Sequence, residues 1–252
     1  MPSTAEVVHA LAAPVGDLGG RWMLDREVLG PSRSFGYPSR YAYYLAGRGG
    51  VLGDVDAHVV HAALGFFEPT LVRKMWEAGV AVEGARASAA RYGAACAQWG
   101  RARLGGFVPA ERLADLNRHV IDSVDPIGMP LFAGWRAEPR PDDSAGLAYF
   151  TTHLMRELRG GAHIAAVVCS GIAPREAILT SEGEGTAQQF GWTAPFPDVS
   201  HLVELRAETE AMTDRTMTRF FDEALNADQS TELLELVLAM KAHLDHAQQQ
   251  TG

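Results

Sequence analysis

Residues 149–171 have the sequence YFTTHLMRELRGGAHIAAVVCSG. Apolar residues recur at helical spacing on both sides of Gly160 and Gly161, which predicts two apolar helices broken at the paired glycines. Titratable side chains surround this predicted break: His153, Glu157, Arg159 and His163. Charged groups beside a core helix must be paired, solvated or used in chemistry. We therefore expect any reactive or ligand-binding centre to lie here.

His153 and Glu157 are four residues apart, so a helix places them one turn apart on the same side. Both fall on the shoulder of the apolar stripe, where a half-buried imidazole and carboxylate shift one another's pKa. His163 follows the break closely enough to join them. Two interpretations stay open. One is an acid/base or polar-anchor site with His153, Glu157 and His163 as catalytic residues, and the other is an ion-paired helix junction.

The rest of the chain predicts an all-α fold, a multi-helix bundle, because strand-like alternation is scarce and helix punctuation is common. Ser3 to Glu6 has capping-box spacing and begins a first helix that we expect to end near Pro14. A soft boundary near 135–142 divides the chain into an N-terminal helical part, residues 1–140, and a C-terminal helical part, residues 141–252, packed on it.

The predicted last helix, residues 228–247, carries an amphipathic stripe of Leu233, Val237, Met240 and Leu244. The stripe either packs within its own domain or forms the seam of a homodimer, and both interpretations stay open.

Several other residues are candidate ligand contacts. Trp135, Phe190 and Trp192 lie in Pro/Gly-rich segments predicted as loops, where large aromatic side chains line a pocket or cover helix ends. Tyr44 belongs to a tyrosine-rich helix over 37–46. Arg48 lies in the glycine-rich segment 47–53, which lacks the lysine and Ser/Thr of a P-loop and is predicted as a tight turn. With Arg159, these residues form the predicted ligand-binding set.

Composition and charge exclude several functions. A net charge of −9 argues against nucleic-acid binding, which requires phosphate neutralisation. No apolar run approaches the roughly 18–20 residues of a membrane span, and the N-terminus lacks a signal-like segment, so we expect a cytoplasmic protein. Cys96 and Cys169 are predicted to be buried free thiols. Because no standard metal motif or cofactor fingerprint is present, we expect neither a metal nor a cofactor.

Several segments together resemble a family of actinobacterial all-helical proteins, labelled helix-turn-helix or MarR-like, of which some members lie near specialised-metabolite gene clusters. They are LAGRGGVLGDVDA (45–57), FFEPTLVR (66–73), PLFAGWRA (130–137), LRGGAH (158–163), FGWTAPFP (190–197) and MTDR (212–215). The resemblance implies a helical fold and leaves open a degenerate winged-helix-like module in the C-terminal third. It supplies no catalytic residues. Moreover, the helices predicted after Pro174 are acidic, whereas a DNA-reading helix carries exposed basic side chains.

Three functional hypotheses follow. The first is a small-molecule-binding protein that acts as a cofactor-independent acid/base enzyme of specialised metabolism, catalysing a cyclisation, dehydration or isomerisation. In it Glu157 or His153 is the base, His163 the acid or orienting group, and Arg159 or Arg48 the anchor of an oxyanion. The alternatives are a ligand-responsive DNA-binding transcription regulator and a non-catalytic ligand carrier.

Overall fold

The computed structural model describes residues 1–251, with side chains through Ala247, and confirms the all-helical bundle. No strand occurs among these residues. The short 3-10 helices are η1 (Gly30–Arg33), η2 (Gly50–Leu52) and η3 (Ser200–Leu202). The α-helices are α1 (Thr4–Gly20), α2 (Arg26–Leu29), α3 (Arg40–Gly49), α4 (Ala57–Leu64), α5 (Pro69–Glu83), α6 (Ala85–Arg103), α7 (Ala110–Ser123), α8 (Pro130–Arg136), α9 (Ser144–Ser170), α10 (Pro174–Gln189), α11 (Val203–Ala224) and α12 (Ala227–Thr251).

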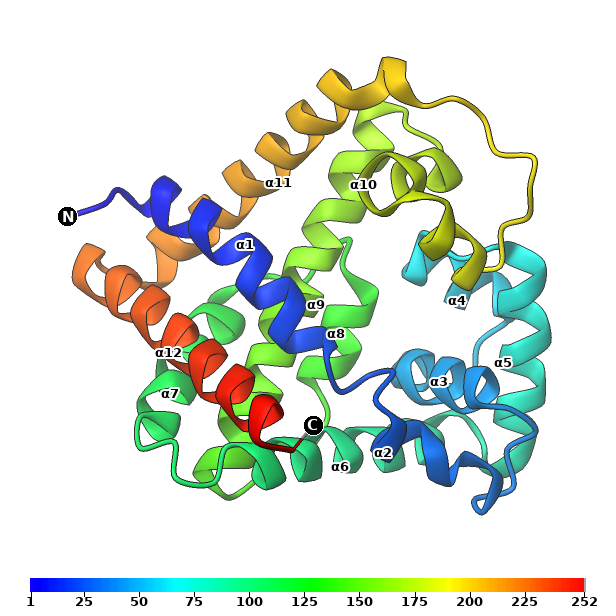
Figure 1. The fold of residues 1–252 in the computed structure, drawn as a ribbon, viewed down its shortest axis with the longest axis horizontal. Helices are drawn as coiled ribbons and strands as arrows, with labels where there is room; N and C mark the ends of the chain where they lie inside the picture. Colours follow the sequence, from blue (N-terminus) through cyan, green and yellow to red (C-terminus); the bar gives the residue numbers. More distant parts are fainter. Residues whose placement is uncertain (252) are drawn as a thin grey trace.

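Helix α9 runs through the middle of the molecule, and α1, α6, α7, α8 and α11 pack around it (Figure 1). The Asp143 side chain caps its N-terminus by accepting from the backbone N–H of Gly146. Its buried apolar face includes Phe150, Leu154 and Leu158, each at most 1% exposed. Burying this face against five neighbours stabilises the bundle, because each large apolar side chain removed from water contributes about 1.5–3 kcal/mol.

The predicted break at Gly160 and Gly161 is wrong, because α9 is continuous for 27 residues. A glycine inside a helix costs only about 1 kcal/mol relative to alanine, which packing readily offsets. A Cβ on Gly161 would lie 2.6 Å from Cγ of Met129, so the missing side chain lets the segment before α8 pack against α9. A Cβ on Gly160 would meet no atom within 4 Å. The two glycines therefore differ in role: one permits a close contact and the other leaves space.

The first helix begins where the sequence predicts but ends later than predicted. Ser3 and Glu6 form the predicted capping box. The helix does not stop near Pro14 but continues to Gly20. Proline removes one intrahelical hydrogen bond, and the burial of Val15 and Leu18 beyond it compensates for that loss.

The glycine-rich segment 47–53 is not a simple turn. Gly47 and Gly49 lie in α3, and η2 follows directly. A Cβ on Gly47 would lie 2.5 Å from Cγ of Tyr92 on α6, so the bare backbone allows α3 and α6 to cross closely. Here too glycine serves helix packing, which local sequence does not reveal.

Other outcomes concern Trp135, helix α10, the two cysteines and the winged-helix-like module. Trp135, expected in a loop, lies in α8 and is fully buried. Helix α10 continues to Gln189, directly before Phe190, with a kink at Gly183, where φ is +78°. Cys96 is buried as predicted, but Cys169 is exposed. A winged helix has a β-hairpin as its wing, and residues 142–251 contain no strand.

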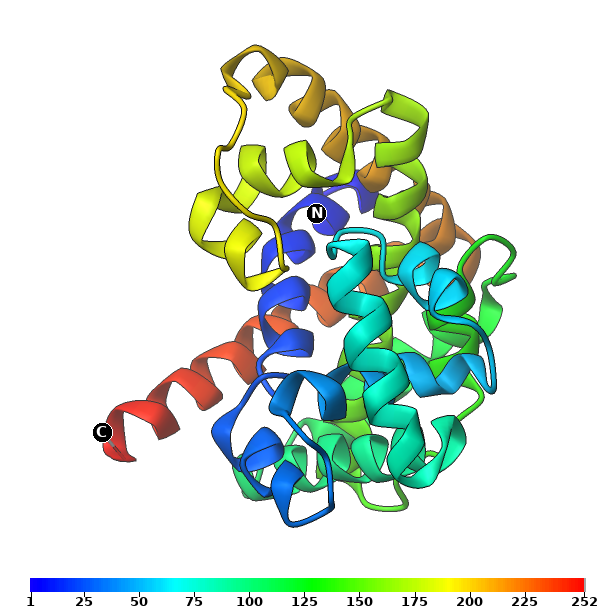
Figure 2. The same ribbon diagram turned by 90° about the vertical axis from the view of Figure 1, so that its right-hand side faces the viewer.

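The amphipathic stripe of the last helix packs inside the chain. All of its members are at most 2% exposed and belong to the main apolar core: Leu233, Val237, Met240 and Leu244. Figure 2 shows the C-terminal part of α12 extending beyond the other helices. The homodimer and the boundary near residue 140 stay predictions.

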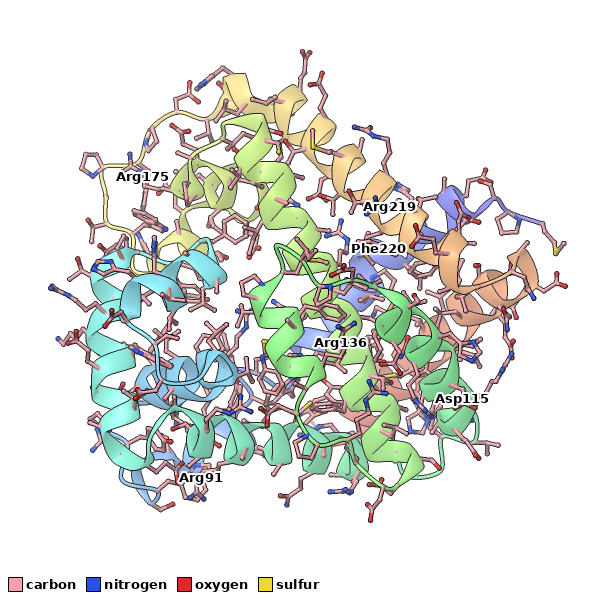
Figure 3. The ribbon with its side chains drawn as sticks, turned by 180° about the vertical axis from the view of Figure 1, so that it is seen from behind. Arg91, Asp115, Arg136, Arg175, Arg219 and Phe220 are labelled. Atoms are coloured by element: carbon pink, nitrogen blue, oxygen red, sulfur yellow. The ribbon has the colours of Figure 1, made fainter. Side chains whose placement is uncertain are left out.

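The back of the molecule is held together by hydrogen bonds as well as apolar contacts. Arg136 of α8, labelled in Figure 3, donates from Nη1 to the carbonyls of Ile121 and Val124 at the end of α7, at 3.1 and 2.6 Å. It thereby satisfies carbonyls that a helix end leaves without partners.

Across residues 1–251 no single helix has both the length and the apolar character to cross a membrane. The pair α9 and α10, bent by 117°, meets that test together by length and composition alone.

Candidate functional site

A partly open cavity of about 480 Å³ lies beside α9 and is lined by parts of α1, α3, α4, α8, α10 and α11. Its volume is within the range of about 300–1,000 Å³ that is typical of small-molecule sites. Much of the wall is aromatic, from Tyr41, Tyr44, Phe66, Phe67, Phe132 and Phe190. Most charged side chains of the wall form two polar clusters, and Ser181, Glu182 and Gln189 of α10 add further polar groups.

The first cluster joins α3 to α9. Nη2 of Arg48 donates to both carboxylate oxygens of Glu157, at 3.1 Å each. Nη1 of Arg48 donates to the hydroxyl oxygen of Tyr44 at 2.8 Å. Nη1 of Arg156 also donates to Oε1 of Glu157, at 2.8 Å. One carboxylate therefore serves two guanidinium groups.

The electrostatics of this cluster keep Glu157 ionised. Burial by itself raises the pKa of its carboxyl group, but the charges of Arg48 and Arg156 outweigh burial and lower that pKa to about 2. Burial disfavours the charged form of Arg48, and Glu157 more than compensates, so the pKa of the guanidinium is raised. The pair is ionic at neutral pH, and Glu157 is engaged as an acceptor rather than free as a base.

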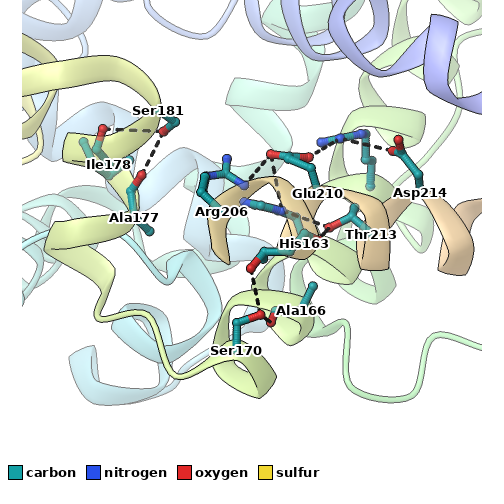
Figure 4. A network of polar contacts seen from close by, with 12 residues as sticks. His163, Ala166, Ser170, Ala177, Ile178, Ser181, Arg206, Glu210, Thr213 and Asp214 are labelled. Carbon is teal, nitrogen blue, oxygen red and sulfur yellow. Dashed lines mark hydrogen bonds and ion pairs between the residues drawn. The ribbon is translucent and has the colours of Figure 1, made fainter. Parts of the chain in front are cut away.

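The second cluster joins α9 to α11 (Figure 4). Nη2 of Arg159 donates to Oε2 of Glu210 at 2.7 Å and lies 3.6 Å from Asp214. Nη1 of Arg206 lies 2.5 Å from Oε1 of Glu210, an ion pair without hydrogen-bond alignment. Here two arginines meet two carboxylates, so the charges balance.

His163 belongs to this second cluster and is neutral. Its Nδ1 lies 3.0 Å from Oγ1 of Thr213. That hydroxyl donates its own hydrogen to the carbonyl of Thr209, at 3.0 Å, so it can only accept from the imidazole. Nδ1 therefore carries the hydrogen and Nε2 a lone pair. Burial lowers the pKa of His163 to about 4, against the opposing charge of Glu210.

The structure brings most of the predicted site residues to the cavity wall. Those that line it are Tyr44, Arg48, Glu157, Arg159, His163 and Phe190. His153, by contrast, is fully buried in the core, not half-buried beside Glu157. Its ring lies 4.6 Å from that of Trp135 and 5.2 Å from that of Trp22, centroid to centroid.

His153 contributes to packing between α9 and α1. Its Nδ1 lies 3.3 Å from the carbonyl of Gly19, and a carbonyl only accepts, so this nitrogen carries the hydrogen. Burial lowers its pKa to about 4, so the imidazole is neutral at neutral pH. Trp192 lies outside the lining as well, with Nε1 donating to the carbonyl of Phe66 at 2.9 Å.

The comparison with protein families decides the classification. A model described as a helix-turn-helix family matches residues 10–196. The chain belongs to this family. Neither the curated proteins nor the solved structures yielded a match. The predicted resemblance to a family labelled helix-turn-helix is thus confirmed, while its actinobacterial origin and gene-cluster setting stay predictions.

The residues matched by the helix-turn-helix family form only part of the cavity wall. Residues 10–196 supply α9 and the whole Arg48–Glu157–Arg156 cluster. Arg206 and Glu210 of α11 lie beyond the matched residues. In the described part of this helix-turn-helix family protein, no group of three or more His, Cys, Asp or Glu side chains is arranged to hold a metal.

Four charged lining residues were missed by sequence reasoning: Arg156, Glu182, Arg206 and Glu210. Arg156 stands in the quoted stretch, seven residues before His163 and therefore on the same face of α9, a spacing that could have identified it. Arg206 and Glu210 have the i,i+4 spacing of an ion pair. Nothing in the sequence indicates that their helix packs against residues 156–164.

Proposed function

We propose that this protein binds a small organic molecule in the cavity beside α9. The observation that carries the proposal is a volume of about 480 Å³ whose aromatic wall contains two arginine–carboxylate clusters. Apolar walls with a few fixed polar groups are characteristic of ligand sites, because the walls provide affinity and the polar groups fix orientation.

The arrangement supports binding better than proton transfer. A general base needs a free lone pair within reach of the proton it removes. Both oxygens of Glu157 accept from guanidinium groups, and the imidazole of His153 lies in the core. Of the three residues predicted as catalytic, only His163 lines the cavity with no guanidinium hydrogen-bonded to its side chain. We therefore favour the ligand-binding hypothesis over the acid/base enzyme.

Filling the cavity tests the proposal. The probe is N-phenyl-1-naphthylamine, an uncharged aromatic compound that fluoresces in apolar surroundings. Wild-type protein should give a saturable rise in fluorescence, and Gly160→Leu should abolish it, because the new side chain grows into the open space at residue 160. Replacing a helical glycine with leucine favours the helix by up to about 1 kcal/mol, so the variant should stay folded.

Gly185→Leu is the matched control. Gly185 is also helical, also has no atom within 4 Å of a built Cβ, and lies outside the cavity lining. It should bind the probe as wild type does. Thermal unfolding followed by near-UV circular dichroism verifies that each variant is folded. Equal probe affinity for folded Gly160→Leu and wild type would overturn the proposal.

A second candidate function is DNA binding, which the family description favours. Helices α4 and α5 are joined by a four-residue connection containing Gly65 at φ +78°, the length and residue type of a helix-turn-helix. Arg73 and Lys74 are exposed on the following helix. Against it, the net charge is −9 and basic side chains are dispersed: Arg91, Arg136 and Arg219 lie far apart in Figure 3.

A mobility-shift assay with mixed-sequence duplex DNA at about 50 mM salt tests this second candidate. Tight binding that weakens steeply with salt, and is lost when Arg73 and Lys74 are both replaced by glutamate, would support it. No shift at that salt concentration would contradict it.

A further inference from the structure

The two polar clusters of the cavity differ in charge balance. The lining carries four arginines against three glutamates, although the whole chain is acidic, and the third glutamate, Glu182 of α10, belongs to neither cluster. Glu210 and Asp214 both contact Arg159, and Glu210 also pairs with Arg206. In the first cluster Glu157 is shared by Arg48 and Arg156. The unmatched positive charge therefore lies in the first cluster.

Within that cluster the free charge belongs to Arg156. Arg48 is held by the two oxygens of Glu157 and by Tyr44, and is 9% exposed. The side chain of Arg156 is 29% exposed. Among the described residues its one charged partner is Glu157, contacted through Nη1 alone. A guanidinium has five N–H donors, so most of those of Arg156 remain for a ligand.

The backbone of α1 makes room for this guanidinium. A Cβ on Gly19 would lie 2.6 Å from Cβ of Arg156, and one on Gly20 would lie 3.1 Å from its Nε. The side chain thus runs along two glycines and is fixed at its tip by Glu157. An arginine held in this way loses less conformational entropy when it binds an anion than a free surface arginine does.

His163 offers a second, different contact on the same face of α9. Its Nε2 carries a lone pair, and within residues 1–247 the hydrogen bond of the His163 ring is the one that Nδ1 makes with Thr213. Seven residues separate it from Arg156, so the two side chains start about 10 Å apart along the helix, with Gly160 between them. The cavity face of α9 therefore presents a cation, an open space and a neutral acceptor in that order.

We infer that the ligand is an aromatic carboxylic acid whose carboxylate binds Arg156 and whose hydroxyl group, at the far end of the molecule, donates to Nε2 of His163. The inference rests on the proposed function and names the class of ligand. Aromatic rings of the wall contact the body of the ligand where Gly160 leaves space. Arg48 holds Glu157 in place, so that Glu157 orients Arg156 rather than repelling the acid.

Competition against bound N-phenyl-1-naphthylamine tests the charge preference. The competitors share a naphthalene body: 2-naphthoate, 2-naphthalenemethanol and 2-naphthylmethylamine. The acid should compete at least about tenfold better than the alcohol or the amine. Arg156→Gln should abolish that preference by weakening the acid far more than the alcohol, because the free cation is lost while Arg48 still pairs Glu157 and the cavity persists. Arg156→Lys should restore part of the preference.

Two further arms complete the test. Arg118→Gln removes an arginine on the surface of α7, outside the cavity. This variant should leave the preference for the acid over the alcohol and the amine unchanged. Adding a hydroxyl group at the far ring, in 6-hydroxy-2-naphthoate, should strengthen competition about fivefold, and His163→Phe should remove that gain alone.

The outcomes separate this inference from the proposed function. Binding of N-phenyl-1-naphthylamine with no preference for the acid, or a preference that survives Arg156→Gln, overturns the inference and leaves ligand binding standing. Failure of the probe and of every naphthalene compound to bind overturns both.

Discussion

Arg48 and Glu157 lie 109 residues apart in sequence and form a buried pair in which Nη2 lies 3.1 Å from each carboxylate oxygen. Removing one partner of a buried ion pair costs about 3–5 kcal/mol, because the other charge stays buried and unpaired. Glu157→Gln should therefore lower the free energy of unfolding by about that amount. Arg48→Met should cost less, since Arg156 still neutralises the carboxylate.

Urea denaturation of wild type, both single variants and the double variant Arg48→Met/Glu157→Met measures the coupling. The double variant should be more stable than Glu157→Gln, because the charge that it leaves without a partner belongs to Arg156, which is partly exposed to solvent rather than buried. Single variants within about 0.5 kcal/mol of wild type would show that the pair does not contribute as described.

Stability should fall as pH is lowered through the weakly acidic range. Burial lowers the pKa of His153 from 6.5 to about 4, so between these values the unfolded chain binds a proton that the folded chain does not. The contribution of His153 to the free energy of unfolding is complete above the pKa of the unfolded chain. It is lost as the pH falls towards the pKa of the folded chain. His163 adds to the trend, because its pKa is lowered in the same direction.

His153→Phe isolates the first contribution. A phenyl ring occupies the same aromatic surroundings without titrating, so the slope of unfolding free energy against pH should decrease by up to about 1.4 kcal/mol per pH unit in this range. Urea unfolding at several pH values measures the slope. An unchanged slope would contradict the neutral, buried state of His153.

Glu157 affects stability in a lower pH range. Its lowered pKa stabilises the fold above about pH 4.5, and that effect is lost as the pH falls towards about 2.

Replacing either of two glycines of α1 with alanine should change the stability of the protein, in opposite directions for the two positions. A Cβ on Gly19 would lie 2.6 Å from Cβ of Arg156 and 2.9 Å from the carbonyl of Thr152, so Gly19→Ala should destabilise by about 1–3 kcal/mol through overpacking. Gly16 has no atom within 4 Å of a built Cβ, so Gly16→Ala should stabilise by up to about 1 kcal/mol through helix propensity. Thermal melts of both variants check the signs. Equal effects would contradict the close approach of α1 and α9.

The two thiols should differ in reactivity. Cys169 is exposed, whereas Cys96 is buried and its pKa is raised by burial. A thiol reagent such as Ellman's reagent should modify one cysteine rapidly in the native protein, and Cys169→Ser should remove that fast phase. Cys96 should react only when urea unfolds the chain. Two fast phases would show that the core around Cys96 opens readily.

Local sequence patterns predicted the helices well, because helix propensity, capping and apolar periodicity act within a few turns. The capping box of Ser3 and Glu6 and the stripe from Leu233 to Leu244 were found as expected. The role of glycine was not predictable in this way. The paired glycines predict a break, yet Gly161 remains helical because Met129 packs against its bare backbone.

The sequence predicts the helix that carries most of the site, but not the residues of other helices that contact it. The stretch around Glu157 lines the cavity, since charged residues beside an apolar stripe have to be used or paired. The pairing of Glu157 with Arg48 depends on how distant helices pack, which no local pattern contains. For the same reason His153 was expected half-buried, whereas Trp22 and Trp135 enclose it.

The open space at Gly160 has an evolutionary consequence. A single base change converts a glycine codon into one for alanine, valine or serine, and residue 160 can accept such a side chain without any shift of the backbone. Under the proposed function, the shape of the ligand that fits could therefore diverge between related genes by point mutation, while the Arg48–Glu157 pair and the bundle around it are inherited unchanged.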